Sequence, residues 1–119
     1  MDIIKKNNKT FVKALKSFQV KEKKGCVFAY DETNEVAIFR VDGKLYCVVN
    51  ICPHQHSPEI YNGIVEDKTI ICPMHGWTFS LEDGRNLTGG KGLEVFEIFE
   101  EKNYIYIEQK VLKKPKWML

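Results

Sequence analysis

Long apolar runs are absent from this sequence of 119 residues. A helix that spans a bilayer needs about 20 consecutive, mostly apolar residues, and no run here comes close to that length. The first residues, Met1 to Lys6, also lack the apolar stretch that follows the opening charges of a secretory signal. We therefore expect a cytoplasmic protein with neither a membrane span nor a membrane partner.

Helical periodicity is hard to find after residue 20, whereas strand signals are frequent. Six segments rich in β-branched and aromatic residues are separated by turn formers: 26–31, 35–41, 44–50, 69–72, 93–99 and 103–109. Asp42-Gly43 is the strongest hairpin signal, because Gly supplies the positive φ that a two-residue turn needs. The length fits one domain, residues 1–119. We expect an all-β fold, a small antiparallel barrel or sandwich.

Acidic residues are nearly absent from both ends of the chain. Residues 1–24 contain eight lysines against Asp2 and Glu22, and residues 110–119 contain four lysines and no acid. Lysine-rich ends are commonly solvated and poorly ordered. Alternatively, they form a docking surface for an oppositely charged partner. We do not expect nucleic acid as that partner, because the basic residues are not interleaved with aromatics on one patch.

Histidine and cysteine are scarce and concentrated. All three histidines lie in CPHQH (52–56) and CPMHGW (72–77), which follow strand-like runs. Two of the four cysteines open these stretches. The other two, Cys26 and Cys47, lie within strand patterns, where cysteine packs as a small hydrophobe. In a reducing compartment, thiols or metal ligands are expected in preference to disulfides.

The two stretches read C-x-H and C-x-x-H, with seventeen residues between them. The candidate ligands are two thiolates and two imidazoles: Cys52, His54, Cys72 and His75. A structural zinc ion takes the same set, but like ligands are then usually paired on one segment. The single residue between Cys52 and His54 also makes a tight chelate for one metal. In a binuclear cluster, the cysteines of both loops can hold one iron while the histidines hold the other.

This pattern resembles the Rieske 2Fe–2S domain, in which two histidines replace two cysteines on one iron. The resemblance covers about residues 10–109, with NICPHQHSP similar to the first cluster loop and ICPMHGWTFSLEDGR to the second. It implies one cluster per chain, held by the four residues named above. It also implies small antiparallel sheets with a two-loop cluster-binding subdomain at about residues 50–80, and histidine edges near the surface as the electron's exit.

Among Rieske proteins, the chain is similar to soluble ferredoxins that supply dioxygenases and to the small subunit of NADH-dependent nitrite reductase. His56 and Met74 occupy the places of two extra loop cysteines of quinol-oxidising relatives, and Trp77 and Phe79 the places of their Ser and Tyr. The resemblance implies a one-electron carrier without catalysis of its own. Its partners would be a flavin-dependent reductase and an oxygenase or other redox enzyme. A cluster-containing structural or regulatory subunit is the alternative.

Some residues near the motif need separate interpretations. Many relatives have glycine in place of His56, which we expect to be a surface or loop-packing residue, or else a protonatable group beside the cluster, but not an iron ligand. We expect Trp77 and Phe79 to pack beneath the cluster and Gly76 to let the backbone approach it. Trp117 either folds back on the domain or binds a partner. No histidine remains for an oxygenase iron site.

Overall fold

The computed structural model describes residues 3–29, 35–51, 58–73 and 76–109. The strands within these ranges are β1 Ile3–Lys6, β2 Lys9–Lys16, β3 Cys26–Ala29, β4 Glu35–Val41, β5 Lys44–Val49, β6 Ile64–Glu66, β7 Thr69–Ile71, β8 Thr78–Ser80, β9 Val95–Phe96, β10 Ile98–Glu101 and β11 Tyr104–Glu108. Two short 3₁₀ turns, η1 Ser17–Gln19 and η2 Ile60–Asn62, complete the described elements. No helix in these ranges is long and apolar enough to cross a bilayer.

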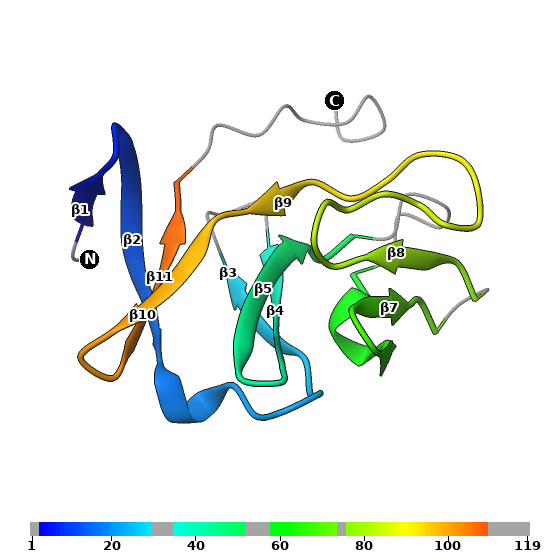
Figure 1. The fold of residues 1–119 in the computed structure, drawn as a ribbon, viewed down its shortest axis with the longest axis horizontal. Helices are drawn as coiled ribbons and strands as arrows, with labels where there is room; N and C mark the ends of the chain where they lie inside the picture. Colours follow the sequence, from blue (N-terminus) through cyan, green and yellow to red (C-terminus); the bar gives the residue numbers. More distant parts are fainter. Residues whose placement is uncertain (1–2, 30–34, 52–57, 74–75, 110–119) are drawn as a thin grey trace.

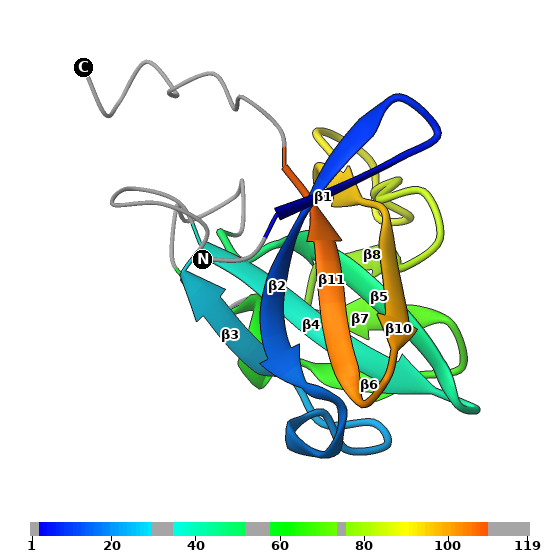
Figure 2. The ribbon, with the colours of Figure 1, turned by 90° about the vertical axis from the view of Figure 1, so that its left-hand side faces the viewer.

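The strands form three antiparallel sheets (Figure 1). The terminal sheet has the order β1-β2-β11-β10 and contains the first and last described strands, with its outer side facing the viewer in Figure 2. The central sheet has the order β3-β4-β5-β9, and the small sheet has the order β6-β7-β8. This arrangement confirms the expected all-β fold of small antiparallel sheets.

Strands β4 and β5 of the central sheet are covered on both faces. Successive side chains of a strand point to opposite sides, so each strand contributes to two hydrophobic clusters. On β4, Ala37 and Phe39 belong to one hydrophobic cluster and Val36 and Ile38 to another. The first cluster, which we call the loop-side core, also takes in residues of the small sheet. The second takes in residues of the terminal sheet, such as Ile105. The nearly continuous apolar run at 35–41 is therefore a strand covered from both sides.

The lysine-rich N-terminal segment departs from one expectation. Residues 3–6 and 9–16 are ordered strands of the terminal sheet, where β2 pairs with β11, and are not a poorly ordered end. Phe11 and Val12 on β2 are only 2% and 4% exposed. Burial of these two side chains and pairing with a strand distant in sequence outweigh the local preference of lysine for solvent.

Candidate metal centre

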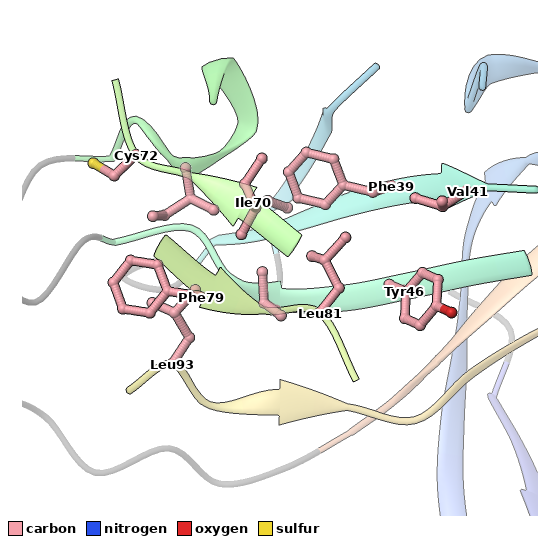
Figure 3. Packing of buried hydrophobic residues seen from close by; sticks show 11 residues of the cluster. Phe39, Val41, Tyr46, Ile70, Cys72, Phe79, Leu81 and Leu93 are labelled. Atoms are coloured by element: carbon pink, nitrogen blue, oxygen red, sulfur yellow. The ribbon is translucent and has the colours of Figure 1, made fainter. Parts of the chain in front are cut away.

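Cys72 begins a tightly closed loop directly after β7. Its backbone amide donates a hydrogen bond to the carbonyl of Trp77 at 2.8 Å, and its carbonyl accepts one from the amide of Gly76 at 3.1 Å. The Cys72 residue is 1% exposed and lies at one end of the loop-side core (Figure 3). The fold thus fixes the backbone of this candidate ligand from both sides and withdraws it from water.

Gly76 has a left-handed backbone, with φ of +76°. A side chain in that conformation is strained, although a Cβ built at Gly76 would meet no described atom within 4 Å. The glycine is therefore required by the turn that returns the chain from Cys72 to Trp77. The sequence interpretation, a close approach of backbone to a cluster, remains a prediction.

Asn50 fixes the base of the other loop. It is 1% exposed. Its side-chain Nδ2 donates to the Glu35 Oε1 at 3.0 Å and to the Pro58 carbonyl at 3.1 Å, while its Oδ1 accepts the Tyr61 amide at 2.9 Å. One buried side chain therefore ties together the start of β4 and the chain on both sides of the segment 51–58. Sequence reasoning missed this role.

The bases of the two loops share one hydrophobic cluster. Ile60, which follows the first loop, packs in the loop-side core with Ile70 and Cys72 of the second loop's stem, and all three are at most 1% exposed. Phe79 is fully buried in the same cluster, and its ring centroid lies 6.4 Å from that of the half-buried Trp77. The packing of Trp77 and Phe79 beneath the loops agrees with the sequence interpretation, whereas their contact with a cluster remains a prediction.

A third segment, residues 86–91, lies beside the second loop. The Thr88 hydroxyl accepts the amide of Thr78 at 2.9 Å, and the Leu87 amide donates to the Thr78 carbonyl at 2.8 Å. Asn86 is 7% exposed and braces this segment through a bond from its Nδ2 to the Lys91 carbonyl at 3.1 Å. A Cβ on Gly90 would be 3.7 Å from the Trp77 ring. The segment therefore borders the loop that Cys72 opens.

The other three candidate ligands, Cys52, His54 and His75, lie outside the described residues. The same is true of three residues that the sequence singled out, His56, Met74 and Trp117. The structure therefore places Cys72 and the stems of both loops, and the four-ligand set stays a prediction. Of the missed residues, Asn50 carries a weak sequence signal, an asparagine directly after an apolar run, whereas Asn86 carries none.

Cys26 and Cys47 are positioned away from the loops. Cys47, on β5, is 2% exposed in the cluster between the central and terminal sheets, and Cys26, on β3, packs half-buried against that cluster. Burial raises the pKa of the Cys26 thiol, which favours its neutral form. Both positions agree with the expectation of small hydrophobic side chains within strands.

Comparison with known proteins identifies the family that this architecture belongs to. The family model for the Rieske [2Fe-2S] domain matches residues 10–97, which include both loops, the central and small sheets, and most of β2 in the terminal sheet. This chain belongs to the Rieske [2Fe-2S] domain family. Its cofactor is therefore a Rieske-type 2Fe–2S cluster, as the paired Cys/His stretches indicated.

Similar proteins include electron-transfer components and a reductase subunit. The chain is 33% identical over 54 residues to the ferredoxin component of the alkene monooxygenase system of Xanthobacter autotrophicus, a match that covers 45% of this chain and 44% of that protein. The Rieske chain thus spans less than half the length of this curated relative. The fold of the Rieske chain described here is similar to a Mycobacterium tuberculosis structure named for the small subunit of an NADH-dependent nitrite reductase. The TM-score is 0.79 at 22% identity, and the match covers 87% of this chain and 98% of that chain.

A complex between a ferredoxin and its oxygenase also contains this fold. The complex of reduced oxygenase and oxidized ferredoxin in carbazole 1,9a-dioxygenase includes a chain with a TM-score of 0.76 and 21% identity. The match covers 87% of the Rieske chain described here and 97% of that chain. At this identity the likeness establishes a shared fold.

The described part of the site fits a Rieske cluster. Cys72 is the one described member of the predicted donor set, whose two soft thiolates and two imidazoles would suit iron–sulfur chemistry. Cys72 is buried at the end of an apolar core, where a thiolate ligand is shielded from water. Independent hydrogen bonds fix the stems of both loops, through Asn50 and through the Cys72–Trp77 pair.

Proposed function

We propose that this Rieske protein is a one-electron carrier whose cluster is held by Cys52, His54, Cys72 and His75. The observation that supports it best is the closed loop of Cys72, buried at the end of the loop-side core within a chain of the Rieske family. When bound, the cluster supplies reversible uptake and release of one electron. As the resemblance implies, the two cysteines hold the inner iron and the two histidines the outer one.

The protein's own contribution is rigidity and exclusion of water. The Cys72–Trp77 hydrogen bond and the Asn50 clamp hold the two loop stems against β4 and the small sheet. Ile60 and Phe79, both fully buried, close the apolar floor below them. Stems fixed in this way should limit reorganisation when the charge of the cluster changes, which favours fast electron transfer. No described residue is required as a general base or a nucleophile.

The proposed partners are a flavin-dependent reductase as donor and an oxygenase or another redox enzyme as acceptor. The similarity to a monooxygenase ferredoxin component and the fold shared with a ferredoxin–oxygenase complex support this role. A second candidate is the small subunit of an NADH-dependent nitrite reductase, which the fold similarity at a TM-score of 0.79 favours. We propose one domain over residues 1–119, with about residues 50–80 as its cluster-binding part, and a cytoplasmic location.

Iron and sulfide analysis with EPR spectroscopy tests the cofactor and its ligands. The purified protein is expected to be red-brown, to contain iron and acid-labile sulfide in equal amounts, and to become paramagnetic on reduction. A colourless protein that contains zinc contradicts the proposal. The carrier role is then tested by mixing the reduced protein with a dioxygenase or with the catalytic subunit of nitrite reductase. We expect the acceptor of the correct class to reoxidise the reduced protein at a rate that saturates with acceptor concentration, and the other acceptor to leave it reduced.

A further inference from the structure

Three turns meet at the end of the molecule that carries the Asp42–Gly43 hairpin. The Ser17 amide donates to the Asn103 carbonyl at 2.9 Å, which joins the turn after β2 to the β10–β11 turn. The Glu22 carboxylate accepts the amides of Asp42 at 2.5 Å and Gly43 at 3.2 Å, which joins the same segment to the β4–β5 hairpin. The segment 17–24 is thus fastened on two sides.

Arg40 holds this end together from inside. Its Nε donates to the Val20 carbonyl at 2.9 Å and its Nη2 to the Ser17 carbonyl at 3.2 Å. The same guanidinium forms a bidentate pair with the Glu100 carboxylate, at 3.0 and 2.8 Å. These four contacts of the half-buried Arg40 hold the turn at residues 17–20 rigidly, since a planar bidentate pair fixes the relative orientation of its two side chains.

Phe18 protrudes from this turn and is 73% exposed. It is the most exposed large hydrophobic residue in the described part of the chain. The other three that are exposed lie elsewhere, at Ile3 on β1, Ile64 on β6 and Leu87 beyond β8. The neighbouring Val20 is buried and anchors the turn, so the rigid backbone holds the Phe18 ring in water.

Exposed lysines lie on the same three turns as Phe18 or next to them. We call this region the basic pole and define it by six exposed lysines on the three turns: Lys16, Lys21, Lys23, Lys24, Lys44 and Lys102. Three acidic residues share these turns, Glu22, Asp42 and Glu101, while Arg40 and Glu100 neutralise each other. The pole therefore carries a surplus of three positive charges, more than the +2 of the whole chain.

The basic pole lies at the opposite end of the central sheet from the loop stems. Strands β4 and β5 meet at the pole through Asp42–Gly43. At their other ends lie Glu35, the first residue of β4, and Asn50, which directly follows β5, and these two belong to the first loop's clamp. Seven strand residues at about 3.3 Å each separate the two ends by roughly 20 Å. In Figure 1, the turn after β2 and the β4–β5 hairpin both lie at the lower edge, and β5 points away from them.

We propose that the basic pole binds an anionic lipid surface, with the Phe18 ring at the headgroup boundary and the lysines around it facing anionic headgroups. A protein partner normally buries about 800 Å² per side around several apolar anchors. The pole offers one such anchor among its described residues. A lone aromatic ring within a set of lysines instead fits the membrane interface, where aromatics lie at headgroup level and basic residues attract anionic lipid. This proposal departs from the expectation of no membrane partner, and it would leave the loop end facing away from the bilayer.

Vesicle binding of the full-length, cluster-loaded protein tests the proposal. We expect cosedimentation with vesicles of phosphatidylcholine and phosphatidylglycerol, little with phosphatidylcholine alone, and loss of binding in high salt because screening shortens the electrostatic reach. Each lysine near an anionic surface contributes about fivefold in affinity, so the pair Lys23→Gln and Lys24→Gln should weaken binding by about 25-fold. Phe18→Ser should weaken it by about tenfold.

Two matched controls separate the pole from general charge and general hydrophobicity. The pair Lys5→Gln and Lys6→Gln removes the same charge from exposed positions on β1, and Ile64→Ser removes an exposed apolar side chain from β6. Both should bind vesicles within about twofold of wild type if the pole is the contact. No binding to anionic vesicles, or equal losses in the pole and control variants, overturns the proposal and leaves an acidic protein surface as the alternative. Vesicle binding does not depend on electron transfer, so either proposal can fail alone.

Discussion

Asn50 and Glu35 are joined by two hydrogen bonds. The Asn50 backbone amide donates to the Glu35 carbonyl at 3.0 Å, and its side-chain Nδ2 donates to the Glu35 carboxylate, also at 3.0 Å. This pair lies where β4 begins and β5 has just ended, directly before the first candidate cluster loop. Asn50 therefore links the central sheet to the base of the first loop through both its backbone amide and its side-chain amide.

The substitution Asn50→Asp tests this clamp. Aspartate keeps the acceptor for Tyr61 but loses both Nδ2 donors and places a second carboxylate against Glu35. A buried partner left unsatisfied costs about 1–3 kcal/mol, so we expect that loss in the free energy of unfolding and faster loss of cluster colour in the presence of a chelator. The control is Asn62→Asp, an exposed asparagine bonded to Glu59, which should change stability by less than about 0.5 kcal/mol. An unaltered denaturation midpoint in Asn50→Asp contradicts the role.

Removal of a thiolate ligand should abolish the cluster. Cys52→Ser and Cys72→Ser each replace a soft ligand that iron requires, and loss of the cluster should destabilise the loops because metal binding and loop folding are coupled. His54→Ala and His75→Ala should leave little cluster. Visible absorbance and iron content measure the outcome.

Two cysteine controls accompany the ligand variants. Cys47 lies in the hydrophobic cluster between the central and terminal sheets, and Cys26 packs against it. Neither is a candidate iron ligand, so Cys47→Ser and Cys26→Ser should both keep the red-brown colour. A folded but colourless Cys47→Ser protein refutes the ligand assignment.

Gly76→Ala should weaken the loop that Cys72 opens. The left-handed φ of +76° costs an L-residue about 1–2 kcal/mol. Gly76 lies between the candidate ligand Cys72 and Trp77, whose carbonyl accepts the hydrogen bond that closes the loop, so the strain would act on this loop. Gly43→Ala is the matched control, since Gly43 has a φ of +82° and open space around it at the basic pole. We expect similar losses of stability in both variants, measured by chemical denaturation, but faster cluster release in Gly76→Ala alone. Equal release rates would show that the second loop does not depend on this turn.

The Arg40–Glu100 pair predicts an acid-sensitive contribution to stability. The hydrogen bond from the Arg40 guanidinium lowers the pKa of Glu100, so its stabilisation is complete above the ordinary glutamate pKa of about 4.3 and is lost as pH falls below that value. Glu100→Gln should therefore lower the melting temperature at neutral pH, and the difference from wild type should shrink between about pH 5 and pH 3. Glu101→Gln, on the next and exposed residue, is the control. A constant Glu100→Gln difference across this range argues against the pair.

The sequence predicted the central sheet well because its signals are local. The apolar run at 35–41 became β4 over the same residues, and Asp42-Gly43 forms the expected turn with φ of 52° and 82°. The terminal sheet was missed in part, since β2 carries three lysines and shows no regular alternation of buried and exposed residues, and its partner β11 lies 88 or more residues away in the sequence. The clamp of Asn50 was missed for a similar reason, because its partners lie 8, 11 and 15 residues away and meet only in the folded chain.

The reduction potential should lie at the low end of the Rieske range, which runs from about −150 to +300 mV. High-potential relatives carry hydroxyl groups where this chain has Trp77 and Phe79, and neither side chain has an O–H donor for a cluster sulfur. Phe79 is fully buried in the loop-side core, and the hydroxyl of the intervening Thr78 donates to the Gly76 carbonyl at 3.3 Å. Without such donors the negative charge of the reduced cluster is less stabilised, so reduction becomes less favourable.

Protein-film voltammetry measures the midpoint potential of the cluster, with Phe99→Tyr on the terminal sheet as a variant that should leave it unchanged. Trp77→Ser, which restores a hydroxyl at one of the two places, should raise it. A wild-type midpoint above roughly +100 mV contradicts the low-potential assignment and the ferredoxin-like role that depends on it.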